Sequence, residues 1–201
     1  MSRLATSFVL AYHGCEKSVA DRAVAGEIDI LQSKRAYDWL GPGAYFWESD
    51  IVRANEWAEQ KIARGDFKSA AVIGAVIDLG HCLDLLVREN IELVKAAYLA
   101  FKAEQETAGL SMPENRSPNG AADPDRILRF LDCAVIRHLH SALERVPLDS
   151  RIVQPFDTVR GTFSEGEPVY PGCGYLEKTH VQIAVRNPAC VKGVFYPRNS
   201  N

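Results

Sequence analysis

The segment GPGAYFWE at residues 41–48 constrains the fold more than any other part of the chain. Two glycines around a proline permit a sharp turn, and the three aromatic residues that follow are typical of a strand. Because side chains alternate between the faces of a strand, Tyr45 and Trp47 are predicted to point to one face and Phe46 to the other. We therefore expect one face to pack in a core and the other to line a site.

Apolar strands near both ends of the chain, with helices gathered between them, predict an α+β fold. The second helix has Ser49 or Asp50 as its N-cap and Gly65 at its end. The predicted strands are 8–13, 44–48, 70–79 and 179–186, with further strands in 151–163 and 191–197, and the predicted helices are 16–28, 50–65, 88–108 and 125–146.

The length and composition are those of an ordinary globular protein. A chain of 201 residues with 47% hydrophobic residues and a net charge of −3 is long enough for one domain spanning residues 1–201, and its charge alone indicates no nucleic-acid footprint. The first 14 residues resemble neither a signal peptide nor a membrane span, so we expect a cytoplasmic protein without a membrane partner. The five cysteines are odd in number and lack a CxxC pair, which argues against a disulfide framework and a zinc site.

Three segments carry residues suited to chemistry. His13 precedes Gly14 at the end of the first predicted strand, and a glycine allows a ligand amide to approach the backbone closely. In the second segment, Gly41 and Gly43 allow a turn and Tyr45 offers a flat face with a polar tip. For both segments, simple packing is the alternative interpretation.

The third segment is the last predicted strand and the acidic loop before it. In a strand, His180 and Gln182 share one face while Val181 and Ile183 share the other, and Glu177 lies at or just before the strand. A strand with two polar residues on one face is either an exposed edge or the lining of a site.

The order of these segments resembles the ADP-ribosyltransferase superfamily. A strand ending in YHG, a strand with GPGAYF followed directly by a helix, and a late strand entered through an acidic loop are similar to its diphtheria-toxin-like or poly(ADP-ribose) polymerase-like branch, over residues 8–62 and 157–196. That branch carries a His-Tyr-Glu motif on three strands around a cleft between two sheets. The resemblance implies that NAD is the substrate and that its cofactor-binding residues are His13, Gly14, Gly43, Tyr45 and Trp57.

In that branch the histidine bonds the NAD ribose and the glycine backbone holds the nicotinamide carboxamide. By the resemblance, Tyr45 stacks on the nicotinamide ring, Trp57 supplies a second aromatic face, and Phe46 packs in the core. Helices 88–108 and 125–146 fit only as additions to the shared fold.

The third motif position has three candidates for the catalytic role: Glu177, His180 and Gln182. The resemblance implies a glutamate that stabilises the positive charge of the transition state, and a carboxylate does so better than a neutral group. We therefore prefer Glu177, while a different strand register places His180 or Gln182 there. Neutral residues at this position occur in relatives that transfer a single ADP-ribose or bind without catalysis.

Other parts of the binding site follow from the resemblance with less detail. No metal is needed. The pyrophosphate requires backbone donors or an arginine or lysine, for which the candidates by nearness in sequence are Arg22, Lys34, Arg35 and Arg53. The loop 164–176 is expected to cover a macromolecular acceptor, protein or nucleic acid, with Glu165, Glu167, Tyr170 and Tyr175 available to recognise it.

Two other classes of function compete with an ADP-ribosyltransferase. One is a Cys-His hydrolase that pairs Cys15 or Cys173 with His13 or His180. The other is a non-catalytic module that binds NAD or ADP-ribose. Small free-standing members of the superfamily are often toxins of toxin-antitoxin or phage-defence systems, which implies an antitoxin or immunity protein as a further partner.

Overall fold

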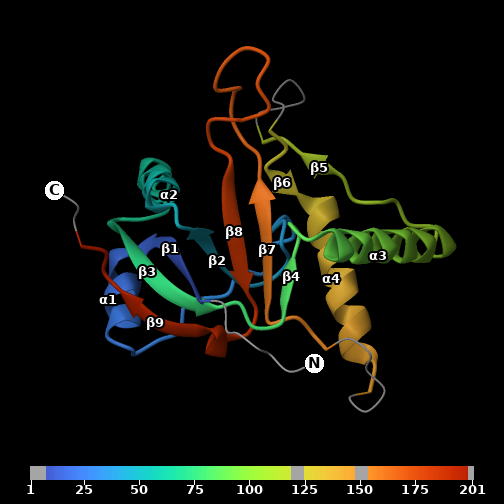
Figure 1. The fold of residues 1–201 in the computed structure, drawn as a ribbon, viewed down its shortest axis with the longest axis horizontal. Coiled ribbons are helices and arrows are strands. Elements are labelled where there is room, and N and C mark those ends of the chain that lie inside the picture. The colour runs from blue at the N-terminus through green and yellow to red at the C-terminus, as the bar shows by residue number, and fades with distance from the viewer. Residues whose placement is uncertain (1–7, 119–124, 148–153, 199–201) are drawn as a thin grey trace.

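The computed structural model describes residues 8–118, 125–147 and 154–198 and has an α+β fold. Its main sheet is mixed, with seven strands in the order β4-β7-β8-β2-β1-β3-β9 (Figure 1). Neighbouring strands are antiparallel except for the parallel pair β4 and β7. The prediction of an α+β fold is confirmed.

The seven strands of this sheet are β1 (Phe8–Glu16), β2 (Ala44–Glu48), β3 (Ala70–Asp78), β4 (Cys82–Asp84), β7 (Thr158–Phe163), β8 (His180–Val185) and β9 (Val191–Phe195). A second sheet pairs β5 (Asn115–Arg116) with β6 (Leu128–Arg129). The α-helices are α1 (Lys17–Val24), α2 (Ile51–Ala63), α3 (Arg88–Thr107) and α4 (Phe130–Arg145).

Most predicted elements are confirmed, and two helices are shorter than expected. α1 ends at Val24, just before Gly26 takes a φ of 74°. The helix predicted from residue 125 begins only at Phe130, because Leu128–Arg129 pairs with Asn115–Arg116 instead. Asp50, one of the two predicted caps, is the N-cap of α2, and its side chain accepts a hydrogen bond from the backbone N–H of Arg53. Residues 151–153 of the predicted strand 151–163 lie outside the described residues.

The sheet is continuous, so the expected core of two separate sheets is not observed. Its junction with the fewest residue pairs is between β1 and β2, which pair only at Ala11 with Glu48 and at Tyr12 with Trp47. By contrast, β1 and β3 form nine pairs. Figure 1 shows β7 and β8 running at a steep angle to β1 and β3, so this short junction joins two differently oriented halves.

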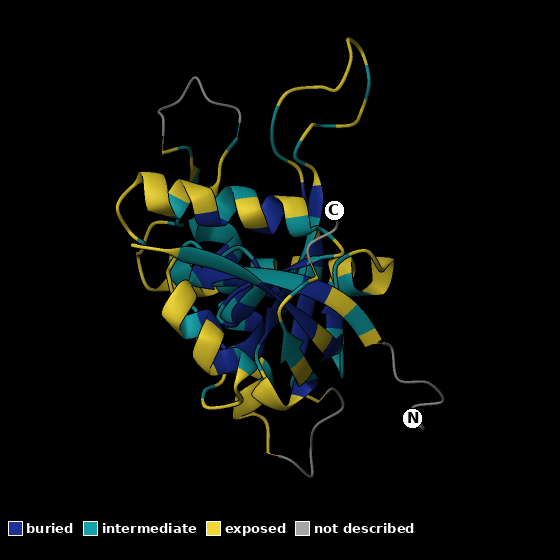
Figure 2. Ribbon diagram, turned by 90° about the vertical axis from the view of Figure 1, so that its left-hand side faces the viewer, coloured by how far each residue is buried: buried dark blue, intermediate teal, exposed yellow. Residues whose placement is uncertain are grey.

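The two faces of β2 and β8 pack in two different cores. Phe46, Ile183 and Val185 belong to a core with α1, β1 and β3, which confirms the prediction that Phe46 packs inside. Tyr45 and Ala184 face the other way, into a core built with α3 and α4. Figure 2 shows the buried residues concentrated in the sheet and the exposed residues on the outer sides of the helices.

The helices leave part of one sheet face between them. α1 packs on the Phe46 face, whereas α2 lies on the opposite face over β1 and β3. α3 and α4 cover the same face as α2, but over the half that contains β4 and β7. Between them lies the part of β2 and β8 that carries Trp47 and Gln182, which we call the central strip.

A long excursion joins β7 to β8. Residues 164–179, called the arm here, fold back on themselves through backbone hydrogen bonds from Val169 to Tyr175, Glu177 to Glu167 and Lys178 to Glu165. The arm projects from the end of these strands (Figure 1). The predicted loop at residues 164–176 is therefore confirmed as a loop.

Candidate functional site

The candidate site begins where β1 and β2 separate. Leu10 accepts a hydrogen bond from Ser49 on the β2 side, so by the alternation of an antiparallel strand the backbone groups of Tyr12 and Gly14 point to that side too. Pairing ends at Tyr12 with Trp47. The backbone N–H and C=O of Gly14 therefore point toward β2, at a position where Gly14 has no paired residue in β2.

The His13 side chain lies at the point where β1 and β2 separate, on the face of the sheet that carries Phe46. Its Nδ1 lies 2.7 Å from the carbonyl oxygen of Tyr45, and its ring lies against Phe46 with centroids 5.5 Å apart. A carbonyl only accepts, so Nδ1 carries the proton and Nε2 is an acceptor when the ring is neutral. Burial lowers the pKa of His13, although the bond to Tyr45 acts in the opposite direction. The neutral form is therefore favoured, and the predicted pair of His13 and Tyr45 is brought together.

The packing of α2 requires a glycine at position 14. A Cβ at this position would lie 2.8 Å from the carbonyl oxygen of Ala54, 3.1 Å from the Cβ of Ala58 and 3.2 Å from a ring carbon of Trp57. α2 thus lies directly on Gly14, and its approach sets Trp57 beside the opening. Helix packing, not a ligand, occupies the space that the missing side chain leaves.

Trp57 belongs to a group of aromatic rings at the edge of the central strip. Its ring centroid lies 5.7 Å from that of Trp47 and 5.8 Å from that of Phe67. The Nζ of Lys61 lies 5.3 Å from the same centroid. One side of Trp57 thus already holds a cation, as an aromatic ring does favourably.

Tyr45 is held by the glycine turn that precedes it. Its hydroxyl donates to the carbonyl of Gly41 at 2.8 Å and accepts from the N–H of Leu40 at 3.0 Å. Gly41 takes a φ of 77°, and Gly43 lies so close to β8 that a Cβ would approach Val185 within 3.0 Å. Burial, followed by the nearby charge of Asp38, raises the pKa of Tyr45 well above its usual value. Tyr45 is thus rigid and neutral, and its ring is held in the core with α3 and α4 and not on the central strip.

Gln182 is the polar residue of β8 that lies opposite Trp47. Its Oε1 accepts a hydrogen bond of 2.6 Å from Nε1 of Trp39, whose ring covers Gly161. An indole N–H only donates, so this contact fixes the orientation of the amide and turns its NH₂ group away from Trp39. Gln182 therefore presents a donor, not a negative charge.

His180 lies two residues before Gln182 on the same face of β8 and is 6% exposed. Its Nδ1 lies 2.6 Å from the carbonyl oxygen of Lys178. Its ring lies between those of Phe163 and Trp47, at centroid distances of 5.7 and 6.4 Å. The structure thus brings His180 and Gln182 together beside Trp47.

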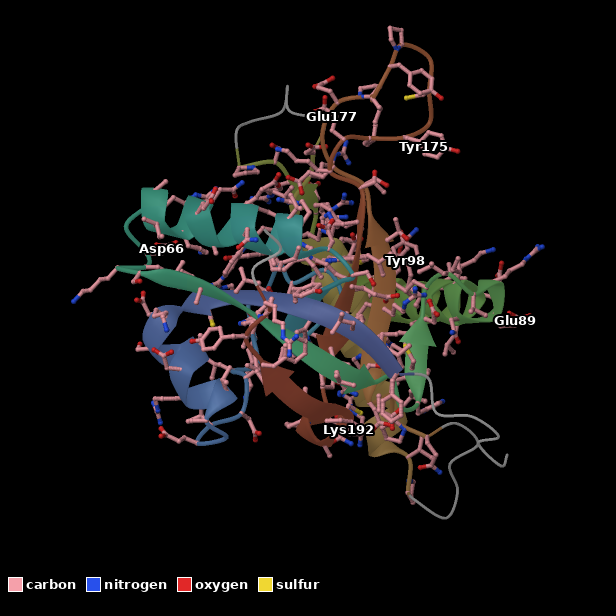
Figure 3. The ribbon with its side chains drawn as sticks, turned by 60° about the vertical axis from the view of Figure 1, so that its left-hand side comes forward. Asp66, Glu89, Tyr98, Tyr175, Glu177 and Lys192 are labelled. Carbon is pink, nitrogen blue, oxygen red and sulfur yellow. The ribbon has the colours of Figure 1, made fainter. Side chains whose placement is uncertain are left out.

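Glu177 is not among the residues that the structure gathers at the strip. It is exposed on the arm, three residues before β8 begins, and its backbone N–H donates to Glu167 at 3.0 Å. Figure 3 shows Glu177 and Tyr175 on the arm, away from the sheet. The strand register thus places Gln182, and not Glu177, opposite Trp47.

The four basic candidates for a pyrophosphate differ in their surroundings. The buried guanidinium of Arg53 is bound to Glu56 at 2.8 Å and to Glu165 of the arm at 2.9 Å. Arg22 belongs to α1, on the Phe46 face of the sheet. Lys34 and Arg35 lie in the segment before β2, and Arg137 of α4 donates to their carbonyl oxygens at 2.7 and 3.1 Å.

The cysteines that a Cys-His hydrolase needs do not form such a pair in the described part of the chain. Cys15 is buried, and burial, assisted by Glu16, raises its pKa to about 11, which opposes a thiolate at neutral pH. Cys173 lies on the arm, and its Sγ contacts the backbone of Tyr170 and Tyr175. Neither thiol is hydrogen-bonded to His13 or His180.

Sequence reasoning missed Trp39 and Trp47 as site residues. Strand alternation predicts Trp47 on the same face as Tyr45, so the sequence contained a signal for Trp47 as a site residue. No local pattern indicates Trp39, whose partner Gln182 is 143 positions away.

Comparison with family models, with curated proteins and with solved structures found no match for this chain. Within residues 8–118, 125–147 and 154–198, no group of three or more His, Cys, Asp or Glu side chains is arranged to hold a metal ion. None of the helices in these ranges has the length and hydrophobicity needed to cross a bilayer.

Proposed function

We propose that this protein binds NAD at the opening between β1 and β2 and transfers its ADP-ribose to an acceptor, releasing nicotinamide. One observation carries the proposal: Gly14 turns a backbone donor and acceptor toward an opening beside Trp57, at the point where His13 is fixed by Tyr45. A primary carboxamide has one acceptor and one donor side, so it matches a free backbone N–H and C=O.

The side chains around the opening suit the rest of such a substrate. Nε2 of His13 is an acceptor for a ribose hydroxyl, because Nδ1 is committed to Tyr45. Trp57 and Trp47 offer aromatic faces to the nicotinamide ring, which is cationic before the bond to ribose breaks. Lys34 and Arg35 remain candidates for the pyrophosphate, whereas Arg53 is already bound by two carboxylates.

The arm is the proposed contact for a macromolecular acceptor. Glu165 anchors it to Arg53, and Gly166 donates a hydrogen bond of 2.9 Å to Asp125. Beyond these anchors, Tyr170 and Tyr175 are 56% and 71% exposed and free to contact another molecule. An antitoxin or immunity protein that covers the arm would block both the acceptor and the site beside it.

A binding module without catalysis is the second candidate, and Gln182 favours it. The amide at the third motif position is neutral and turns its donor group away from Trp39. A donor does not stabilise a developing positive charge, so the transition state would gain little from it relative to NAD. We therefore expect slow turnover from the native protein.

Binding of NAD tests the proposed function. We expect His13→Ala to weaken NAD binding about tenfold, since the loss of one hydrogen bond to a ribose hydroxyl and of its packing amounts to about 1.4 kcal/mol. Titration calorimetry measures the change, and circular dichroism checks the fold. His138→Ala on α4 is the matched control and should bind as the parent does. Equal affinity of the His13→Ala variant and the parent, or no binding by either, would contradict the proposal.

The third motif position can be tested by giving it a carboxylate. In Gln182→Glu, the N–H of Trp39 can still donate to the new side chain, which keeps its length and adds a negative charge. We expect nicotinamide release to rise about tenfold or more, a modest part of the effect of one well-placed electrostatic contact. Glu177→Gln, on the exposed arm, should leave the rate unchanged. The opposite result, a large loss in Glu177→Gln and no gain in Gln182→Glu, would return the third position to Glu177.

A further inference from the structure

A cavity of about 240 Å³ lies on the Phe46 face of the sheet, on the side opposite the central strip. Its floor is the cross-strand pair of Ala44 in β2 and Val185 in β8. Its walls are the end of α1, which lies beside β9 (Figure 1), the segment 28–32, the short 3-10 helix η2 (Pro188–Cys190) and β9 itself. The proposed function uses none of these elements except β2 and β8, whose other face carries the strip.

Most of the lining is apolar, and its side chains are small or branched. Ala23, Ile30, Ala44 and Val185 line the cavity and are buried. Water gains few hydrogen bonds over such a surface, which therefore favours an apolar occupant, and an apolar cavity of about 150 Å³ already admits benzene. The cavity over Ala44 thus has room for one ring, or one branched chain, with a short substituent.

Hydrogen bonds hold two walls of the cavity in place. Ser33, directly after the segment 28–32, exchanges backbone hydrogen bonds of 2.8 and 3.0 Å with Gly43, just before β2. On the other side, Asn187 caps η2 with its side chain and donates to Asp157 at 2.9 Å. The cavity is therefore formed before a ligand arrives, which reduces the entropy lost on binding.

Two polar side chains of the lining offer acceptors. Nε2 of Gln32 donates to the carbonyl oxygen of Arg186 at 2.6 Å, so the amide oxygen of Gln32 is the group left for a ligand. Asp29 is exposed at the cavity, and within the residues that the structure describes its carboxylate forms no ion pair. The lining thus offers one neutral and one negatively charged acceptor.

Lys192 is the cation among the described residues of the lining, and its ammonium group is already engaged. It donates to the carbonyl oxygen of Ala189 at 2.8 Å and lies 3.9 Å from the carboxylate of Asp78. The charge that is left unbalanced at the cavity is therefore the negative charge of Asp29. A ligand with a positive charge is favoured there over one with a negative charge.

We propose that this cavity binds a small primary amine, whose compact apolar body lies over Ala44 and Val185 and whose ammonium group is recognised by Asp29. An ammonium group has three donors and no acceptor, so the amide oxygen of Gln32 suits it as a second partner. The volume is that of one ring with a short substituent, which indicates a free small molecule as the occupant. The inference does not depend on NAD, because the two sites lie on opposite faces of the sheet.

The test uses three probes of similar size, which are benzylamine, benzyl alcohol and benzoate. We expect the parent to bind benzylamine about threefold more tightly than benzyl alcohol, as for one partly exposed ion pair, and benzoate least tightly. Two-dimensional NMR titrations measure these affinities, and the shifted amide signals should belong to the end of α1, segment 28–32 and β9. Asp29→Asn should bind benzylamine no better than benzyl alcohol. Asp66→Asn removes the same charge beyond α2 and should behave as the parent does.

A larger side chain in the wall tests the apolar part of the cavity. Ile28→Phe should take up the space and weaken binding of benzylamine and benzyl alcohol about tenfold, because less apolar surface of the probe is then buried. Leu31 is 84% exposed in the same segment, so Leu31→Phe should leave both affinities unchanged. If Ile28→Phe does not fold, the three probes with the parent and with Asp29→Asn decide.

Each contrary result removes one part of the proposal. Equal affinity of the parent for the three probes, a preference for benzoate, or a preference for benzylamine that survives in Asp29→Asn would overturn the amine and the role of Asp29. Absence of binding, or shifted signals that lie away from the cavity, would overturn the cavity as a site. Neither NAD nor His13 takes part in these measurements, so the proposed function is tested separately.

Discussion

Gly14→Ala should destabilise the protein by about 3 kcal/mol, the upper part of the range for overpacking in a filled interior. The new Cβ would lie 2.8 Å from the carbonyl oxygen of Ala54, and a helix backbone cannot yield as the end of a flexible side chain does. α2 must therefore move away from β1 and carry Trp57 with it. Chemical denaturation measures the loss, and we expect NAD affinity to fall more than in His13→Ala because the opening itself changes shape.

Gly193→Ala is the matched control for this prediction. Gly193 also lies in a strand of the main sheet, but an added Cβ there meets nothing within 4 Å. Its stability should stay within about 0.5 kcal/mol of the parent, as for a surface substitution. Equal stability of Gly14→Ala and Gly193→Ala would show that α2 does not need a glycine beneath it.

The stability of the protein should fall steeply with acid because of His140. Its ring is 4% exposed, and neither nitrogen has a partner in the described ranges. Burial, assisted by the charge of Arg186, lowers its pKa from 6.5 to about 3. Between these two pH values His140 is protonated in the unfolded chain but neutral in the folded protein. The free energy of unfolding should therefore fall by up to about 1.4 kcal/mol for each pH unit from pH 6.5 toward pH 3.

His140→Leu isolates this effect. The leucine removes two unpaired buried nitrogens and cannot take up a proton, so its unfolding free energy should depend less on pH than that of the parent below pH 6.5. At pH 7 it should be more stable by about 1 kcal/mol, since a buried polar atom without a partner is costly. Above pH 7 both proteins should show the same pH dependence. Parallel curves for parent and variant down to pH 4 would contradict the assigned pKa.

The local features of the chain were readable from its residues. Strand alternation separated Phe46 from Tyr45, and the apolar runs at 44–48 and 70–79 became β2 and β3 within one residue at each end. Asp50 was recognisable as a cap because capping depends on a side chain and a backbone N–H three residues apart. Such signals depend on periods of two or 3.6 residues and on neighbours in sequence, which a single sequence contains.

The candidate site was predictable in part. The sequence placed His13, Gly14, Tyr45 and Trp57 in one hypothesis. In the structure, His13 contacts the backbone carbonyl of Tyr45 and Trp57 packs against Gly14, whereas the Tyr45 ring lies in the core with α3 and α4. The continuity of the sheet was not predictable, because it depends on only two residue pairs between β1 and β2. No local pattern reveals how far two strands remain paired before they separate.

The assignment of Glu177 shows where local reasoning ended. Charge and residue type made Glu177 the preferred third residue, and its catalytic role stays a prediction. In the structure the arm folds back on itself and holds Glu177 outside the sheet. Gln182 faces the strip because the β2 and β7 registers set it opposite Trp47 and Gly161, and Trp39 fixes its amide from 143 positions away. Side-chain direction along one strand follows from periodicity, whereas the choice of partner across strands follows from packing between distant segments, which no stretch of sequence encodes alone.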